Sequence, residues 1–337
     1  EHKLERVIQF ADRIVYINGD GAANVGTPEE ILMQSPIAPP IVHLARALGM
    51  TEIGTTVREM RRMTTDIRQI QSSNVVEASV KRTEAVITFE KLTVSYDNKI
   101  ALNGISSTIF AGEIVAVMGR NGAGKSSLLK AIAGVNRPHA GKVSLLGSDP
   151  FDLHGKARRE KIGFIPQEPS DLLYGQSVKI ECEQADRDNE LIAGTTYEVL
   201  QQLVPGISLS THPRDLSEGQ RLGLALSVVL SSNPTVLILD EPTRGLDYEA
   251  KNELTRMLIH FASTFGKAVL LATHDVELVA ELASRVIFIA DGDIVADGTT
   301  LDVLLSSPAF APQVAKVMSP QPWLRVKDVV AAIEGLR

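Results

Sequence analysis

The spacing of apolar and polar residues changes along the chain and predicts several kinds of element. Residues 85–118 alternate apolar and polar side chains, with turn signals at Asp97-Asn98 and Ala111-Gly112, so this stretch predicts antiparallel strands. Beyond it, short apolar runs alternate with helical patterns, as in an α/β fold with a largely parallel sheet. The strands predicted to be buried are 114–118, 236–239 and 268–272.

The first part of the chain recurs near its C-terminus at a constant offset, so that Ala11 falls on Ala283 and Pro40 on Pro312. Residues 1–42 match residues 273–314 without a gap, and after a short slip residues 57–60 match 326–329. A period as long as a whole domain excludes a solenoid, whose repeats span about 20–50 residues. We therefore expect residues 1–50 to be the C-terminal remnant of an earlier copy of one domain, whose remaining part lies upstream of Glu1.

These patterns divide the chain into four segments. After the remnant, residues 51–84 are expected to form a linker with a short helix, because residues 71–84 are polar and weakly patterned. Residues 85–300 are expected to form one complete domain, and residues 301–337 a C-terminal helical extension. The linker carries a stripe at helical spacing that predicts a core-facing side, with a partner-binding face as the alternative: Val57, Met60, Met63, Ile67 and Ile70.

A glycine-rich segment lies between the predicted strand 114–118 and a predicted helix over residues 126–135. It reads GRNGAGKS from Gly119 to Ser126 and fits the phosphate-loop pattern G-x-x-x-x-G-K-[ST] in its required strand–loop–helix context. Lys125 is expected to reach the β- and γ-phosphates, and the Ser126 hydroxyl to ligate Mg²⁺. A chance match is the alternative, and the flanking elements argue against it. The residues expected to hold ATP here are Gly119, Asn121, Gly122, Ala123, Gly124, Lys125, Ser126 and Ser127.

Two adjacent carboxylates, Asp240 and Glu241, follow the apolar run 236–239. Such groups are costly to bury without a cation. We expect Asp240 to hold Mg²⁺, and Glu241 to polarise the water that attacks the γ-phosphate.

Composition narrows the class of protein. The 337 residues are 44 % hydrophobic and carry a net charge of −7, which argues against broad nucleic-acid binding. Cys182 is the only cysteine, so a disulfide within the chain and a cysteine zinc site are excluded. The sequence has neither a signal peptide nor an apolar run of about 18 residues, so we expect a soluble, cytosolic chain. A start at Glu1 instead of methionine hints at a fragment.

Four further segments follow the phosphate loop in the order found in ABC-type ATPases, which the chain resembles over residues 85–300 in full and over residues 1–50 in part. The segments are FIPQ at 164–167, LSEGQ at 216–220, GLD at 245–247 and THD at 273–275. The resemblance implies a P-loop NTPase of ABC type, with an antiparallel β subdomain, a central mainly parallel sheet and a helical signature subdomain. It also implies ATP and Mg²⁺ as ligands and ATP hydrolysis as the activity.

The resemblance assigns a role to each segment. Gln167 would contact Mg²⁺ or the attacking water, and His274 would hold the γ-phosphate and Glu241 in line. Tyr96 would stack on adenine. The residues that would contact ATP bound by an opposing domain are Ser217, Gly219, Gln220 and Asp247. Glu218 stands where the family's LSGGQ segment has its first glycine.

Simpler interpretations compete with these roles. Ser217 could be an ordinary helix N-cap, His274 a structural histidine, and Tyr96 a packed strand residue. The histidine of the first copy is retained as His2, but the chain carries one phosphate loop and one signature, whereas a closed ABC dimer needs two of each. An inactive regulatory domain is disfavoured, because Lys125, Asp240, Glu241 and His274 are all present.

Two functional classes remain: a transport ATPase, and a soluble ABC ATPase of translation or DNA repair. The segment after Gln167 is short and contains no long coiled coil, and residues 49–84 are not strongly charged, which disfavours the second class. The fused pair, SPIAPPIV at 35–42 and PSDLLY at 169–174 resemble the double ATPase subunits of actinobacterial energy-coupling-factor (ECF) importers of the cobalt and vitamin type.

That resemblance implies the expected partners. They are a second ABC ATPase domain, fused upstream or in trans, a transmembrane coupling protein and a substrate-binding membrane protein, with no nucleic acid. The chain would be peripheral, at the cytoplasmic face of the cell membrane, and would power import of a B vitamin or a transition-metal ion.

Overall fold

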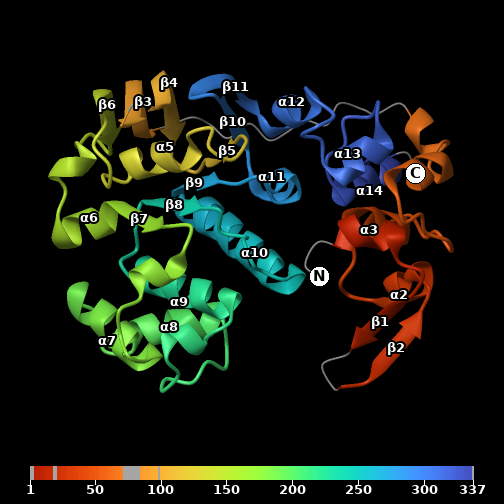
Figure 1. Cartoon of the computed structure of the whole chain (residues 1–337), viewed down its shortest axis with the longest axis horizontal. Coiled ribbons are helices and arrows are strands. Elements are labelled where there is room, and N and C mark those ends of the chain that lie inside the picture. Colours follow the sequence, from red (N-terminus) through yellow and green to blue (C-terminus); the bar gives the residue numbers. More distant parts are fainter. Residues whose placement is uncertain (1–3, 18–20, 71–83, 98, 336–337) are drawn as a thin grey trace. The chain divides into compact units, whose positions relative to one another are not determined.

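The computed structural model describes residues 4–17, 21–70, 84–97 and 99–335, which form two compact units (Figure 1). The large unit spans residues 80–300, and the small unit combines residues 1–79 with residues 301–337. His2, Asn98 and most of the expected polar linker, residues 71–83, lie outside the described residues.

A six-stranded sheet with the order β11-β10-β5-β9-β8-β7 forms the centre of the large unit. β10 and β11 pair antiparallel, and the other four pairings are parallel. Every residue of β5, β8 and β9 is buried, as expected for strands covered on both faces. The mainly parallel sheet expected from the sequence is confirmed. The strands are β5 (Ile114–Met118), β7 (Ile162–Ile165), β8 (Val236–Asp240), β9 (Ala268–Ala272), β10 (Arg285–Ala290) and β11 (Asp293–Thr299).

A second, three-stranded sheet begins before the central one in the chain. Its order is β4-β3-β6, and both pairings are antiparallel. The pattern over residues 85–118 predicts the pairing of β3 with β4, whereas β6 lies beyond that stretch. The strands are β3 (Ala85–Tyr96), β4 (Lys99–Phe110) and β6 (Ala140–Leu145). Helix α5 (Lys125–Ile132) packs against β3, β8 and β9, and its buried face, with Leu128 and Ile132, joins both sheets in one core.

Helices α7, α8 and α9 form a separate cluster inside the large unit. Val178, Cys182, Leu200 and Leu224 are its buried centre. Burial, with nearby acidic residues, raises the pKa of the Cys182 thiol to about 12, so this cysteine is an inert core residue. The helices that follow α5 in this unit are α6 (Gly155–Lys161), α7 (Val178–Asp188), α8 (Thr195–Leu203), α9 (Glu218–Leu230), α10 (Tyr248–Phe265) and α11 (Val276–Leu282). Within the described ranges, every helix falls short of the length and hydropathy that crossing a bilayer requires.

The small unit contains a hairpin and several short helices around its own core. β1 and β2 pair antiparallel, and helices from both ends of the chain surround Leu44, Met60, Val317 and Trp323, which are fully buried. The elements are α1 (Leu4–Val7), β1 (Ile14–Ile17), β2 (Ala23–Gly26), α2 (Pro28–Gln34), α3 (Pro40–Ala47), α4 (Val57–Met63), α13 (Gln313–Met318) and α14 (Val326–Glu334). Helix α12 (Thr300–Leu305) begins where the large unit ends.

The described part of the expected linker, residues 51–70, belongs to this core. Ile53 and Met60 are buried there. The core-facing stripe is confirmed at four of its five positions, because Val57, Ile67 and Ile70 also pack against the cluster. The exception is Met63, which is 37 % exposed.

Arg285, at the start of β10, connects the two sheets of the large unit. Its guanidinium lies 2.6 Å from a carboxylate oxygen of Asp297 and 3.5 Å from one of Glu113, and donates to the Thr108 carbonyl on β4. The side chain is only 11 % exposed, so these ion pairs are largely shielded from water. Removing one partner of such a pair leaves an uncompensated charge.

We therefore expect Arg285→Met to lower the free energy of unfolding by about 3 kcal/mol. Chemical denaturation of the whole chain measures this. The matched control is Arg13→Met, at the exposed counterpart of Arg285 in the first copy of the repeat, which should change the value by less than about 0.5 kcal/mol. Equal effects of the two substitutions would contradict a special role for Arg285.

Candidate functional site

Four parallel strands end at the same edge of the central sheet, because adjacent parallel strands point the same way. The glycine-rich loop follows β5, Gln167 follows β7, Glu241 follows β8, and His274 follows β9. The sheet thereby gathers segments that are far apart in the sequence, from Gly119 to His274.

The loop from Gly119 to Gly124 has a backbone that its glycines make possible. Gly124 has a φ of 111°, and a Cβ there would collide with the Ala101 carbonyl oxygen. Gly119 has a φ of 152°, and a Cβ there would collide with the Ile289 carbonyl oxygen. The turn leads directly into α5, so its N–H groups and the positive end of the helix can receive phosphate oxygens.

The Lys125 ammonium is held at this turn. It donates to the carbonyls of Gly119 at 3.0 Å and Arg120 at 3.2 Å, and it lies 3.9 Å from Glu241 Oε1. The side chain is only 6 % exposed. Lys125 therefore links the glycine-rich loop to the acidic end of β8.

Glu241 is fixed by its backbone and by a neighbouring histidine. Its φ is 50°, an unusual value for a residue other than glycine, and its N–H donates to the Ala272 carbonyl on β9 at 2.8 Å. His274 Nδ1 lies 2.8 Å from Glu241 Oε2. Backbone strain of this kind gathers at functional sites. A carboxylate oriented by an imidazole can accept a proton from water.

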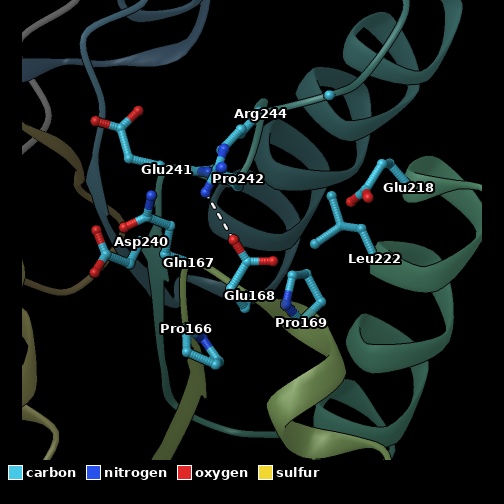
Figure 2. Close-up of a pocket in the computed structure, with 11 residues that line it drawn as sticks. Pro166, Gln167, Glu168, Pro169, Glu218, Leu222, Asp240, Glu241, Pro242 and Arg244 are labelled. Atoms are coloured by element: carbon cyan, nitrogen blue, oxygen red, sulfur yellow. Dashed lines mark hydrogen bonds and ion pairs between the residues drawn. The ribbon is translucent and has the colours of Figure 1, made fainter. Parts of the chain in front are cut away.

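A cavity of about 170 Å³ opens beside these groups. Figure 2 shows Gln167, Asp240 and Glu241 on one of its sides and Glu218 and Leu222 on the opposite side. Its lining residues are Pro166, Gln167, Glu168, Pro169, Glu218, Leu222, Asp240, Glu241, Pro242, Arg244 and Gly245. The structure therefore brings together Gln167, Asp240 and Glu241 as the sequence predicted, with Lys125 and His274 in contact with Glu241.

The cavity also contains an ion pair that the sequence analysis missed. Arg244 Nη1 lies 2.7 Å from Glu168 Oε1, so the segment after β7 is joined to the segment after β8 (Figure 2). Both side chains are more than half exposed, which limits such a pair to about 1 kcal/mol or less. In the sequence, the only sign of this ion pair was that Glu168 and Arg244 each carry a charge beside a motif. Charge alone does not reveal a contact between two separate loops.

The segment LSEGQ forms the start of α9. Ser217 is the N-cap: its hydroxyl accepts from the Gln220 N–H, and the Gln220 side chain accepts from the Ser217 N–H. Ser217 therefore caps α9, and its contact with ATP stays a prediction. Glu218, in place of the family's glycine, lies 3.2 Å from Arg221, which also donates to the Leu216 carbonyl at 2.9 Å.

The remaining predicted residues lie outside the wall of this cavity. Asp247 is the N-cap of α10 and accepts from the Ala250 N–H at 2.8 Å. Tyr96 is 45 % exposed at the end of β3, and its hydroxyl accepts from Asn136 at 2.9 Å. Within the described residues, Ser217, Gly219, Gln220, Asp247 and Tyr96 are all absent from the cavity wall.

Known proteins are similar to this chain in sequence and in architecture. The profile of the family described as ABC transporter matches residues 102–244. An ABC transporter ATP-binding protein of Streptomyces coelicolor is 42 % identical over 99 % of this chain. One from Clostridium tetani is 32 % identical over 94 % of this chain and 73 % of its own length. The chain spans 65 % of the length of the Streptomyces coelicolor relative and 64 % of one from Streptomyces avermitilis.

Two solved structures resemble most of the chain. A dimeric ATP-binding cassette in a post-hydrolysis state, bound to ADP and Pi, has a TM-score of 0.58 and 26 % identity, covering 64 % of this chain and 98 % of its own. The protein cbiO1 from Clostridium perfringens, described as part of the ABC transporter complex cbiONQ, also has a TM-score of 0.58 and 26 % identity, covering 75 % of this chain and all of its own. The chain therefore belongs to the ATP-binding proteins of ABC transporters and carries an ABC ATPase domain.

Proposed function

We propose that this chain is the ATP-binding and hydrolysing part of a protein that powers import of a small substrate through an ECF-type ABC transporter. The observation that carries the ATPase part is the contact between Glu241, His274 and Lys125 at one edge of the sheet. The alternative, a soluble ABC ATPase of translation or DNA repair, is not favoured, since the relatives are named as ABC transporter ATP-binding proteins.

ATP would bind with its phosphates in the glycine-rich loop. Backbone N–H groups along this loop and the Lys125 ammonium would surround the β- and γ-phosphates. Tyr96 would stack on adenine. The residues proposed to contact ATP are Gly119, Asn121, Gly122, Ala123, Gly124, Lys125, Ser126, Ser127 and Tyr96.

Asp240 has the environment of a residue that needs a cation. It is 2 % exposed, and its Oδ1 has no hydrogen-bond partner among the residues that the structure describes. Burial raises the pKa of its carboxyl group, against a hydrogen bond from Ser126 that lowers it. These donors fit Mg²⁺, which prefers oxygen ligands, so Asp240, Ser126 and Gln167 would hold it. The bound ion would neutralise charge on the phosphates.

Hydrolysis would depend on Glu241 and His274. Glu241 would take the proton from the attacking water, and His274 would orient that carboxylate through the 2.8 Å contact with Oε2. Gln167, just after the end of β7, would contact the water or the metal and transmit the state of the site to the adjoining surface.

A second cassette would complete the ATP site. Ser217, Gly219, Gln220 and Asp247 would contact ATP bound by the opposing cassette. The positive end of α9 suits a phosphate. ATP would favour the closed pair because it binds two surfaces there and one surface in the open pair.

The exposed hairpin β1–β2 supports an upstream first cassette. Its first three pairs have the register of its repeat β10–β11, with Ile14 opposite Gly26 as Val286 is opposite Gly298; β10–β11 shifts its register after Phe288. Val15 and Ile17 are 60 % and 68 % exposed, whereas their counterparts Ile287 and Ile289 are fully buried. The counterparts pack in a sheet where β10 also pairs with β5. We propose that residues 1–50 belong to a first cassette whose phosphate-loop strand pairs with β1.

The surface beside Gln167 suits a membrane partner. Tyr174, a short distance after Gln167 in the sequence, is 84 % exposed, and exposed aromatic residues are common binding anchors. The cbiO1 protein, part of a transporter complex, supports the ECF assignment. We propose a transmembrane coupling protein and a substrate-binding membrane protein as partners, no nucleic acid, and a peripheral position at the cytoplasmic face. The cargo would be a B vitamin or a transition-metal ion.

Asp240→Asn should raise the free energy of unfolding by about 1 kcal/mol in buffer without divalent metal, because it removes a buried charge. The gain should shrink as the pH falls, since the raised pKa lets wild-type Asp240 take up a proton first in the folded state. Denaturation at several pH values measures it, with exposed Asp171→Asn as the control. Destabilisation by Asp240→Asn would indicate that protein groups alone satisfy the carboxylate.

Glu241→Gln should reduce ATP turnover by about 10²- to 10⁴-fold in the protein paired with its second cassette, because glutamine cannot accept the proton. ATP binding should persist, since the phosphate loop is unchanged. Steady-state hydrolysis and equilibrium nucleotide binding measure the two effects. Glu249→Gln, exposed on α10, is the control. Unchanged hydrolysis would remove Glu241 from its proposed role.

Affinity purification from detergent-solubilised cells should recover two multi-span membrane proteins with the protein, identified by mass spectrometry. Tyr174→Asp should lose them and retain ATP binding. The control, Val295→Asp, changes an exposed apolar residue on β11, at the opposite edge of the central sheet from β7. Recovery of ribosomal or DNA-bound partners without membrane proteins would refute the importer.

A further inference from the structure

The loop that follows α5 is anchored by close backbone contacts. Gly134 has a φ of 69°, and a Cβ there would lie 2.6 Å from the Pro150 carbonyl oxygen, so only glycine allows this approach. The N–H groups of Val135 and Asn136 donate to the Lys130 carbonyl at 2.8 and 3.2 Å, which closes the last turn of α5. The loop is therefore fixed to the end of the helix.

The other end of this loop is attached to β3. The Arg137 guanidinium carbon lies 4.7 Å from the centre of the Phe151 ring, a cation–π contact. The His139 N–H donates to the Thr93 carbonyl at 2.8 Å, and His139 Nδ1 accepts from the Ser95 N–H at 3.2 Å. These bonds fix the loop beside the last residues of the strand.

Tyr96, the last residue of β3, has a side chain that is only partly covered. It is 45 % exposed, so part of its ring is open to a ligand. Exposed side chains ordinarily exchange rotamers within nanoseconds, and ordering one of them on binding costs free energy. A ring that stacks on a base therefore binds better when the protein already holds it in place.

A hydrogen bond from the anchored loop holds this ring. The Asn136 side-chain amide donates to the Tyr96 hydroxyl at 2.9 Å, and Asn136 is itself partly buried. The hydroxyl is at the far end of the tyrosine ring, so the bond restrains the first side-chain torsion and uses neither face of the ring. The restraint is therefore compatible with stacking on a base.

We propose that Asn136 is a positioning residue of the ATP site, which holds the Tyr96 ring in the orientation that stacks on the base. This proposal rests on the proposed stacking of adenine on Tyr96, and Asn136 acts through that ring without touching the base. α5 begins at Lys125, which would contact the phosphates, and leads at its other end into the loop that carries Asn136. One helix therefore sets the position of the ring relative to the phosphates.

The test compares binding of ATP, GTP and inorganic tripolyphosphate to the whole chain with Mg²⁺, by isothermal titration calorimetry. Asn136→Leu should weaken ATP and GTP alike by about 3- to 10-fold, the effect of one hydrogen bond, because every nucleobase offers a face for stacking. Tripolyphosphate has no base, so its binding should stay unchanged. Unchanged ATP binding would overturn the proposal, and so would unequal losses for ATP and GTP, which would place Asn136 on the base itself. Loss of tripolyphosphate binding would show that Asn136 supports the fold instead.

Further variants examine the bond from both of its ends. Tyr96→Phe keeps the ring and loses the bond, so it should weaken ATP as Asn136→Leu does, and the two changes together should add nothing. Additive losses would contradict a shared bond.

A conservative variant and a control complete the set. Asn136→Asp can accept a hydrogen bond from the Tyr96 hydroxyl, so it should restore the ratio of ATP to tripolyphosphate affinity. A ratio as low as that of Asn136→Leu would count against the proposal. The control, Gln184→Leu, removes an exposed amide that donates to Asp188 at 2.8 Å on α7, and it should alter neither affinity.

Tyr96→Ala separates failure of this proposal from failure of the proposed stacking. It removes the ring, so it should weaken ATP binding by about 10-fold or more. If Tyr96→Ala weakens ATP binding and Asn136→Leu does not, stacking stands and the positioning role is wrong. If neither change affects ATP binding, adenine does not stack on Tyr96 and the positioning role fails with it.

Discussion

Burial of β5, β8 and β9 on both faces of the central sheet is the constraint on which the site depends. Apolar residues occupy these strands up to Asp240, the last residue of β8, so polar chemistry is confined to the strand ends. The parallel pairing brings those ends to one edge. Glu241 directly follows β8. It is consequently within reach of Lys125, which lies far before it in the sequence, and of His274, which lies after it.

Much of this arrangement was predictable because its signals are local. The glycine loop, the acids after 236–239 and the strand before His274 are each legible in a short stretch of sequence, and parallel strands with known loop positions fix the rest. The antiparallel sheet was legible from alternation over residues 85–118. The positive φ of Glu241 could not be predicted from the sequence. It accompanies the hydrogen bond from the Glu241 N–H to the Ala272 carbonyl on a neighbouring strand.

Contacts between distant segments were beyond the sequence. The pairs Arg244–Glu168 and Arg285–Asp297 depend on where loops and strands end in space. The stripe on α4 predicted that Met60 would be buried, but nothing local indicated helices from the other end of the chain as its cover. Residues 51–70, the described part of the segment interpreted as a linker, pack in this core, which the polarity of residues 71–84 could not reveal.

In the small unit α3 packs against its repeat α13, α4 packs against α13, and α14 packs against α3, and these reciprocal contacts have a consequence for symmetry. In a dimer of identical chains, both partners at a two-fold axis must carry the same residue. In one chain they can differ, as Ile41 and Gln313 do, and as Arg46 and Met318 do. Each face then recognises the other instead of itself. The two helix pairs, α3 with α4 and α13 with α14, are therefore not interchangeable, and each occupies a defined side of the core that they share.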